Sequence, residues 1–589
     1  MMSGSAFRTS VFGAWLLTSF ILIIAAYPSL AAWRFPDPDD QLRLLQVRDW
    51  LGGQSWFDVT QYRMNAPLGG AMHWSRFVDI PIAAVIILVT PLFGTAYGET
   101  AALVIVPLLT LGIVMALVAT LTRRLLDHQH AILATFLVPM CVEVTHQLRP
   151  MRIDHHGWQM ALALVIMCGL LDVRVRRGGM IAGLALGLWL SISLEGLPFA
   201  VLTMALLGLR WAFDREQGAR LNAATLTLAF TAPVFYAVTH QASQWGLFYC
   251  DAVSAVHLAV FAAAGAGSFS LVRIAPKQLM VRLAGLAALA VGCAALLLMV
   301  APSCAAGPFT ALDPLVYDFW YVRIMEGLPI WHQTPSVMAF TLALPLLAIG
   351  GTVAAIVRST GETRVQWGGL LFMLAGATII AVLVQRASGV ANLLALPPAS
   401  IIVLSAVKWA RSFDRALPRM VATLAAALLA APGLVAANAL QLVSNSKPEV
   451  VTRNASLCLE NDEISKLAVL RAGNVMASLD ASPSILLETQ HRIVASSHHR
   501  NHAAMHDVIA TFIGTAEEAR VIIAKRRIDY VVVCPGQAET TLYKLRAPDG
   551  FWAQIDAGQL PTWLVRVKVK GMDQLKVWRV KPAETSNNG

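Results

Sequence analysis

Apolar runs of about 20 residues recur through the first three quarters of this 589-residue chain. A helix of that length crosses the roughly 30 Å hydrocarbon core of a bilayer and pairs its own backbone groups internally. Charged residues make up only 14% of the chain, against about 25% in soluble domains. The pattern predicts a polytopic α-helical membrane protein with about 13 spans. These are residues 11–32, 100–122, 130–148, 158–172, 180–194, 196–211, 221–240, 253–272, 281–301, 336–357, 366–384, 389–408 and 417–437.

Basic residues between the apolar runs fix the orientation of the chain. Under this assignment the basic clusters all fall on one side: Arg8, Arg123 with Arg124, Arg174 to Arg177, Arg210 to Arg220, Arg273 to Arg282, Arg358 with Arg364, and Lys408 to Arg419. Short cytoplasmic loops carry an excess of Lys and Arg, so this side is inside. The net charge of +10 therefore reflects topology, and we expect no nucleic-acid partner. The first apolar run exceeds the length of a signal-peptide core, which favours an uncleaved helix.

The odd number of spans places two long loops and the C-terminal tail on the outer side. The loops are residues 33–99 (outer loop 1) and 302–335 (outer loop 5). Residues 80–95 are apolar but short, and counting them as a span would move Arg123 and Arg124 outside. We therefore expect a re-entrant or interfacial element there. The chain divides into a transmembrane domain at 1–437 and a periplasmic α/β domain at 438–589.

The tail has the composition and patterning of a small α/β domain. Strands are predicted at 485–487, 528–534 and 563–567, with a helix at 516–526. Cys458 and Cys534 both lie in this domain, where an oxidising compartment would allow a disulfide. Two free thiols are the alternative that the sequence leaves open.

Acidic residues gather at the outer ends of the predicted helices, and charges so close to a membrane indicate function. They are Asp37, Asp39 and Asp40 after the first span, Asp154 between the third and fourth spans, and Glu326 in outer loop 5. Carboxylates from three separate loops suit Mg²⁺ or Mn²⁺. Each acid alone has a plainer interpretation, as a solvated helix start, a loop turn or a loop acid. Because all lie on one face, we predict Asp37, Asp154 and Glu326 as catalytic, metal-binding residues.

Arginines near these acids indicate a phosphate-containing substrate. A divalent cation neutralises charge on a phosphate leaving group, and a guanidinium binds phosphate through paired hydrogen bonds. We expect Arg386, Arg152, Asp40 and His155 to bind substrate. In the tail, the basic, His-rich stretch 498–502 contains Arg500, which we also expect to contact a diphosphate or an acidic acceptor. A solvated loop is the alternative for that stretch.

Several of these segments follow a known pattern. Outer loop 1 contains Asp37-Pro38-Asp39-Asp40-Gln41-Leu42-Arg43, Gly53, Trp56-Phe57-Asp58 and Pro67-Leu68-Gly69. With Asp154-His155-His156, Glu326 followed by Pro329, and Arg386, the chain resembles the GT-C glycosyltransferases, specifically the catalytic subunit of oligosaccharyltransferase. The resemblance implies thirteen transmembrane helices and an outer C-terminal domain. It makes Asp37, Asp154 and Glu326 metal-proximal and Arg386 phosphate-binding. His156 stands where the family has a carboxylate, so it becomes a metal-ligand candidate.

The family's acceptor-peptide motif, Trp-Trp-Asp-Tyr-Gly, does not occur in the tail. We therefore expect an inverting transfer of a sugar or oligosaccharide from a polyprenyl-phosphate or polyprenyl-diphosphate carrier, at the outer face of a bacterial inner membrane, to an acceptor glycan, lipid or protein. Lipid A or a surface polysaccharide is an alternative acceptor. A lipid-linked-sugar transporter or flippase is an alternative from another class, although transporters place ionisable groups near the bilayer midplane.

Overall fold

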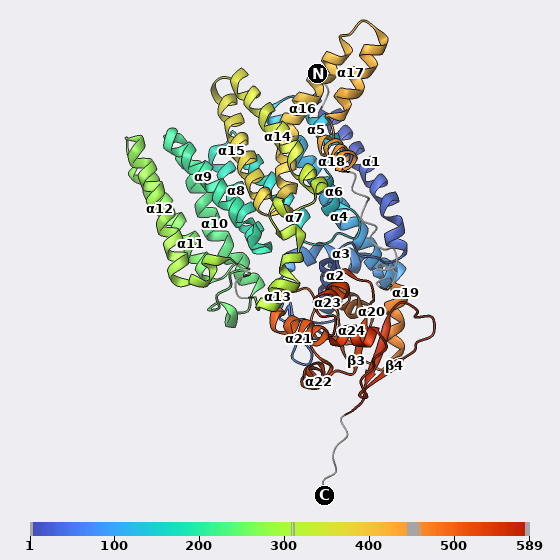
Figure 1. The fold of residues 1–589 in the computed structure, drawn as a ribbon. Helices are drawn as coiled ribbons and strands as arrows, with labels where there is room; N and C mark the ends of the chain where they lie inside the picture. Colours follow the sequence, from blue (N-terminus) through green and yellow to red (C-terminus); the bar gives the residue numbers. More distant parts are fainter. Residues whose placement is uncertain (1–3, 308, 310–311, 445–457, 459–460, 583–589) are drawn as a thin grey trace.

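The computed structural model describes the chain except residues 1–3, 308, 310–311, 445–457, 459–460 and 583–589. Long helices fill most of the molecule, and the tail forms a compact domain at the end opposite the N-terminus (Figure 1). Within the described residues, 11 helices are long and apolar enough to cross a membrane, or up to 13 if each of two bent pairs forms one span. The predicted polytopic α-helical architecture is confirmed.

Most predicted spans coincide with single long helices. They are α1 (Gly4–Ala31), α4 (Thr95–Leu125), α8 (Val175–Ile192), α9 (Leu197–Phe213), α10 (Gly218–Thr239), α11 (Ala255–Ile274), α12 (Leu279–Val300), α14 (Pro335–Arg358), α15 (Gly361–Leu383) and α16 (Ser388–Arg411). The span predicted at 158–172 is α7 (His156–Leu170), whose 15 residues are fewer than a straight crossing needs.

Two predicted spans are bent. Helices α5 (His128–Leu137) and α6 (Val142–Leu148) meet at 73° around Cys141. Helices α17 (Ala416–Leu428) and α18 (Pro432–Ser444) meet at 97°. Pro432 begins the second helix of this pair, because proline fits the first turn of a helix and interrupts one that runs into it. Helix α18 continues past the composition change at 437, and residues 445–457 lie outside the described part.

The segment expected to be re-entrant or interfacial is a continuous helix. Helix α3 (Arg76–Phe93) contains both Pro81 and Pro91 and is long and apolar enough to count among the possible spans. Gly94 adopts φ 90°, a conformation that favours glycine, and turns the chain directly into α4. Helix α3 folds back on the first half of α4, where a Cβ on Gly98 would lie 2.4 Å from Thr90 Oγ1.

Small residues bring the transmembrane helices close together. Gly179 and Gly183 of α8 face α10 so closely that added Cβ atoms would lie 2.3 Å from the carbonyl oxygens of Arg220 and Ala224. Small residues spaced four apart permit such backbone approach, which drives helix association where the hydrophobic effect is weak.

The tail forms a five-stranded sheet in the order β2-β1-β3-β5-β4. Strands β1 (Asn474–Ala477), β2 (Arg492–Ile493) and β3 (Tyr530–Val533) are parallel, while β5 (Lys576–Val580) pairs antiparallel with β3 and with β4 (Leu564–Val567). The prediction at 528–534 is confirmed by β3, that at 563–567 by β4, and the helix at 516–526 by α22 (Ala516–Lys525). Residues 485–487 are helical instead, within α20 (Ser482–Glu488), because Pro483 begins that helix.

Outer loop 1 docks onto the tail. Its helix α2 (Pro38–Leu51) lies beside α20, and Gln41 donates to Ser484 Oγ at 2.8 Å. The amide of Ile493 donates to the carbonyl of Arg63 at 2.8 Å, and the amide of Ala66 donates to the carbonyl of Ile493 at 3.0 Å. The loop thus covers the exposed edge of β2, which would otherwise present unpaired backbone groups.

Two disulfides lie on the side assigned as outer. Cys458 is bonded to Cys534 within the tail, and Cys250 after α10 is bonded to Cys304 after α12. The first settles the alternative that the sequence left open, and the second was not predicted. Disulfides persist in oxidising compartments, so both agree with the orientation deduced from the basic loops.

Candidate active site

Asp37 and Asp40 position the start of α2. Asp37 caps the helix, with its Oδ1 accepting from the amide of Asp39 at 2.9 Å, and Pro38 occupies the first turn. Arg152 Nη1 lies 2.9 Å from Asp37 Oδ2 and 3.0 Å from Asp40 Oδ2. The Asp-Pro helix start therefore brings the carboxylates of Asp37 and Asp40 into contact with the guanidinium of Arg152.

Asp40 also binds the loop that carries Asp154. Its Oδ1 accepts from the backbone amides of Ile153 at 2.8 Å and Asp154 at 3.1 Å. The Asp40 side chain has no exposed surface. The carboxylate therefore fixes the position of Asp154 relative to α2 and is not itself open to a substrate.

Asp154 is surrounded by cationic and imidazole groups. The Nδ1 atoms of His155 and His156 lie 2.6 and 2.9 Å from its two oxygens, and Arg43 Nη2 lies 3.4 Å from Oδ1. Although burial opposes ionisation, the contacts with His155 and His156 hold the pKa of Asp154 well below its usual range.

Glu326 reaches the same site through Arg386. Arg386 Nη1 lies 3.6 Å from Glu326 Oε1 and 2.9 Å from Glu195 Oε1. The second oxygen of Glu195 lies 3.5 Å from His155 Nε2 and accepts from Gln159 at 3.0 Å. A continuous chain of polar contacts therefore joins Asp154 to Glu326 across four loops.

Asp39 lies among these acids. Burial raises the pKa of Asp39 well above its usual value, and the charges of Asp37, Asp154 and Glu326 raise it further. Contacts link its neighbours as well, since Arg152 contacts both Asp37 and Asp40, and Asp40 accepts from the amide of Asp154. The predicted acids are brought together on one face.

Sequence reasoning had not assigned roles to three members of the site. Asp39 was one of three neighbouring acids and Arg43 was part of the loop motif, whereas Glu195 was not singled out. The signal for Arg43 was its position three residues after Asp40, which places both on one face of a helix. No local signal identified Glu195, because its partner Arg386 is far away in the sequence.

The donor set at Asp154 fits a divalent cation. Asp154, His155 and His156 offer ligand atoms that all lie within 4.8 Å of one another. His156 is buried, its Nδ1 contacts Asp154, and its Nε2 has no hydrogen-bond partner among the described residues. Asp37 and Glu326 lie in the same site but contact Arg152 and Arg386, respectively.

No protein-family model and no curated protein matches the chain. Solved structures of the Archaeoglobus fulgidus oligosaccharyltransferase AglB do match. The apo form has 16% identity and TM-score 0.65, and the complex with an inhibitory peptide and a dolichol-phosphate has 15% and 0.64. Each alignment covers 89% of this chain and 69% of that one. A complex of the same enzyme with Zn and sulfate has 13% identity and TM-score 0.57, covering 88% and 67%.

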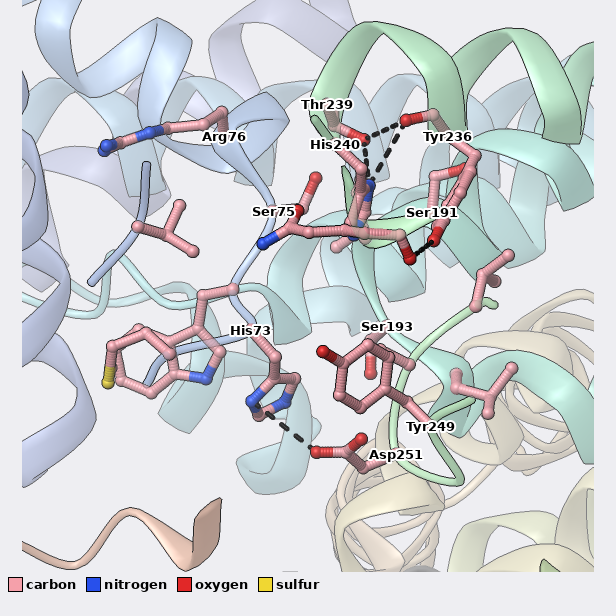
Figure 2. Close-up of a pocket in the computed structure, with 18 of the residues that line it drawn as sticks. His73, Ser75, Arg76, Ser191, Ser193, Tyr236, Thr239, His240, Tyr249 and Asp251 are labelled. Carbon is pink, nitrogen blue, oxygen red and sulfur yellow. Dashed lines mark hydrogen bonds and ion pairs between the residues drawn. The ribbon is translucent and has the colours of Figure 1, made fainter. Parts of the chain in front are cut away.

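This chain has the GT-C fold. Helix α2, which carries Asp40, contacts the tail, and the acid site lies at the ends of α7, α8 and α15. A pocket opens beside it, between outer loop 1, the ends of α8 and α10, and the 240–254 loop (Figure 2). Ser193 and Leu194 line the pocket, and Glu195 follows them directly.

Arg500 lines the same pocket of the GT-C domain. Its guanidinium donates to both oxygens of Asp251, at 2.7 and 2.8 Å, and lies 4.3 Å from the centre of the Tyr249 ring. The His-rich stretch that contains it is not a solvated loop, because His498 and Asn501 are buried. The stretch packs against outer loop 1, where Asn501 donates to the carbonyl of Ala71 at 3.3 Å.

Proposed function

We propose that the protein is a membrane glycosyltransferase that moves a sugar or oligosaccharide from a polyprenyl-phosphate or polyprenyl-diphosphate carrier to an acceptor at the outer membrane face. One observation carries the proposal: a chain of polar contacts links Asp37, Asp154 and Glu326, although they come from three separate loops. The AglB complex with dolichol-phosphate is a lipid-carrier complex on the same fold, which supports the carrier class.

The residues that would hold a divalent cation are Asp37, Asp154, His156 and Glu326. Mg²⁺ or Mn²⁺ bound there supplies positive charge to a phosphate leaving group. The Nε2 of His156, which forms no hydrogen bond with any described residue, supports this assignment, as does the crystallisation of AglB with Zn and sulfate. A carboxylate-rich donor set with one imidazole accepts several divalent metals, so the site favours a cation without selecting one.

Arg386 is placed to bind the carrier phosphate. One of its Nη atoms contacts Glu195 and Glu326, while its Nε is buried without a hydrogen-bond partner among the described residues. A phosphate oxygen would satisfy that donor, and charge-assisted bonds of this type are among the strongest in proteins. We assign Arg152 and Asp40 to positioning Asp37 and Asp154, since both are buried and contact each other.

A carboxylate beside the cation would orient or deprotonate the acceptor. Asp37 and its neighbour Asp39 are the candidates, and the raised pKa of Asp39 brings it nearer to the range of an effective general base. Attack of the acceptor oxygen on the anomeric carbon, with departure of the carrier phosphate, breaks one bond as it forms another. Direct displacement inverts the anomeric centre.

The test is sugar transfer from a lipid-linked donor by Asp37→Ala and Glu326→Ala. Loss of at least about a hundredfold in rate is expected, because each removes a charge that acts on the reacting atoms. Glu362→Ala is the matched control, since this exposed acid lies at the opposite end of α15 from the site. Full activity in both site variants would reject the assignment.

Identification of the labelled product reveals the acceptor. Radiolabelled sugar found in a glycan, in lipid A or in protein distinguishes the acceptor classes, and net movement of donor between leaflets without product would favour a flippase. We place the enzyme in a bacterial inner membrane with its tail in the periplasm. The disulfides on the outer side support that location.

A further inference from the structure

A second cluster of imidazole and carboxylate groups lines the pocket beside the acid site. His73 comes from outer loop 1, Asp251 from the loop between α10 and α11, and His498 and His499 from the segment between β2 and α21 (His502–Ile513). His499 Nε2 lies 2.8 Å from Asp251 Oδ2, and His73 Nδ1 lies 3.9 Å from the same oxygen. Figure 2 shows His73 and Asp251 facing each other beside Tyr249.

Several ring nitrogens in this cluster form no hydrogen bond within the described part of the chain. His498 is 3% exposed, and neither of its ring nitrogens has a hydrogen-bond partner among the described residues; the same holds for His73 Nδ1. The ring centres of His73, His498 and His499 lie 5.0 to 5.3 Å from one another. A buried donor or acceptor without a partner costs about 1–3 kcal/mol. Two histidines of this cluster, His73 and His498, therefore carry buried ring nitrogens that could bind a ligand.

We propose that His73, Asp251 and His499 bind one divalent cation of the zinc class. The ligand atoms of His73, Asp251 and His499 all lie within 4.8 Å of one another. Imidazole nitrogens with one carboxylate oxygen form a common donor set for Zn²⁺, which favours four ligands.

Arg500 orients the carboxylate of this site. Its hydrogen bonds to both oxygens of Asp251, at 2.7 and 2.8 Å, fix the plane of the carboxylate. Asp251 Oδ2 is also the oxygen nearest His499 Nε2 and His73 Nδ1. Outer partners that hold a ligand in this way are usual around protein metal sites. They also explain why an arginine occurs next to a cation site.

The cation would join three outer segments that are far apart in the sequence. Asp251 follows Cys250, whose disulfide to Cys304 ties its loop to the beginning of outer loop 5. His498 and His499 belong to the tail, and His73 to outer loop 1. The site would therefore clamp the tail onto the membrane domain, and it is independent of the glycosyltransferase proposal.

The experiment measures Zn²⁺ affinity and Zn²⁺-induced thermal stabilisation of the full-length protein in detergent after chelator treatment. The variants are His73→Ala, His499→Ala and His499→Gln, the last keeping a side chain that donates to Asp251. His506→Ala is the matched control, because His506 lies on the neighbouring helix α21, 41% exposed. His156→Ala separates this site from the acid site. Co²⁺ provides a second probe through its visible absorption when four-coordinate.

We expect the native protein, His506→Ala and His156→Ala to gain thermal stability with Zn²⁺. All three His73 and His499 variants should lose at least tenfold in affinity for one equivalent while unfolding at the native temperature without metal. The proposal is overturned if these variants bind Zn²⁺ as the native protein does, or if His156→Ala alone abolishes all binding. Whether or not Asp37→Ala loses sugar transfer, the result of this Zn²⁺-binding experiment would be unaffected.

Discussion

Asp40→Ala tests whether one buried carboxylate holds together the two loops that carry Asp37 and Asp154. The change removes three accepted bonds, from Arg152 at 3.0 Å and from the amides of Ile153 and Asp154 at 2.8 and 3.1 Å. Each orphaned amide costs about 1–3 kcal/mol, and the bond to the charged guanidinium contributes about 1.5–3 kcal/mol. Because Arg152 keeps Asp37 at 2.9 Å, we expect the low end of the sum, a loss of about 4 kcal/mol in unfolding free energy.

Asp40→Asn refines this test. The asparagine oxygen can still accept both amides, while its amide group faces Arg152, so the expected cost is about 2 kcal/mol. Thermal unfolding in detergent, followed by tryptophan fluorescence, should rank the native protein above Asp40→Asn, and Asp40→Asn above Asp40→Ala. Asp49→Ala is the control, since Asp49 lies on the same helix and accepts a side-chain bond from Gln61 at 2.7 Å; about 1 kcal/mol is expected there.

If the proposed function is right, sugar transfer should fall at least about a hundredfold in Asp40→Ala, because a displaced Asp154 would no longer hold the cation in place. Asp40→Asn should retain more activity than Asp40→Ala. Equal unfolding temperatures for the native protein and Asp40→Ala would show that Asp40 does not hold these loops. Equal costs for the asparagine and alanine variants would show that the backbone amides are not what it binds.

Three further predictions rest on other contacts in the structure. Burial opposes the charge on His155, but Asp154 and Glu195 raise its pKa to about 10. The charged His155 therefore stabilises the fold fully below the unfolded pKa near 6.5, and this stabilisation is lost as the pH rises toward 10. His155→Gln should flatten the dependence of thermal stability on pH across that window, and an unchanged pH profile would contradict this. Gly183→Val should lower the free energy of unfolding by at least about 2 kcal/mol, because a Cβ there would lie 2.3 Å from the Ala224 carbonyl oxygen. A Cβ at Gly292 meets no described atom within 4 Å, so Gly292→Ala should be neutral in the same thermal unfolding assay. The double change of Cys458 and Cys534 to serine should destabilise the tail by about 3 kcal/mol. Limited proteolysis measures this, with the native protein under reducing conditions as the comparison. Equal cleavage rates for the oxidised native protein and the variant would contradict the prediction.

The elements whose form depends on local chemistry could be identified from the sequence. The hydrocarbon thickness sets the length of a crossing helix, so apolar runs alone located most spans. The apolar run at 528–534 specified the strand β3. The three-residue run at 485–487 was too short for its apolar pattern to distinguish strand from helix. The local signal there was Pro483, which precedes the run and begins α20.

The predicted acids of the candidate site were found because they lie at the ends of recognisable spans. The sequence could not show that Arg152 joins Asp37 to Asp40, or that Arg386 joins Glu195 to Glu326. Arg152 and Arg386 lie far along the chain from these partners, and their meeting depends on how the helices pack.

Local sequence determined that this chain crosses a membrane many times and carries acids at one face, because span length and charge placement are properties of single segments. Only the tertiary structure decided which charges face each other. His73, Asp251 and His499 have no common sequence signal, and they meet because outer loop 1 and the tail dock against the 240–254 loop. Contact between distant segments arises from the packing of the whole fold, which no local pattern encodes.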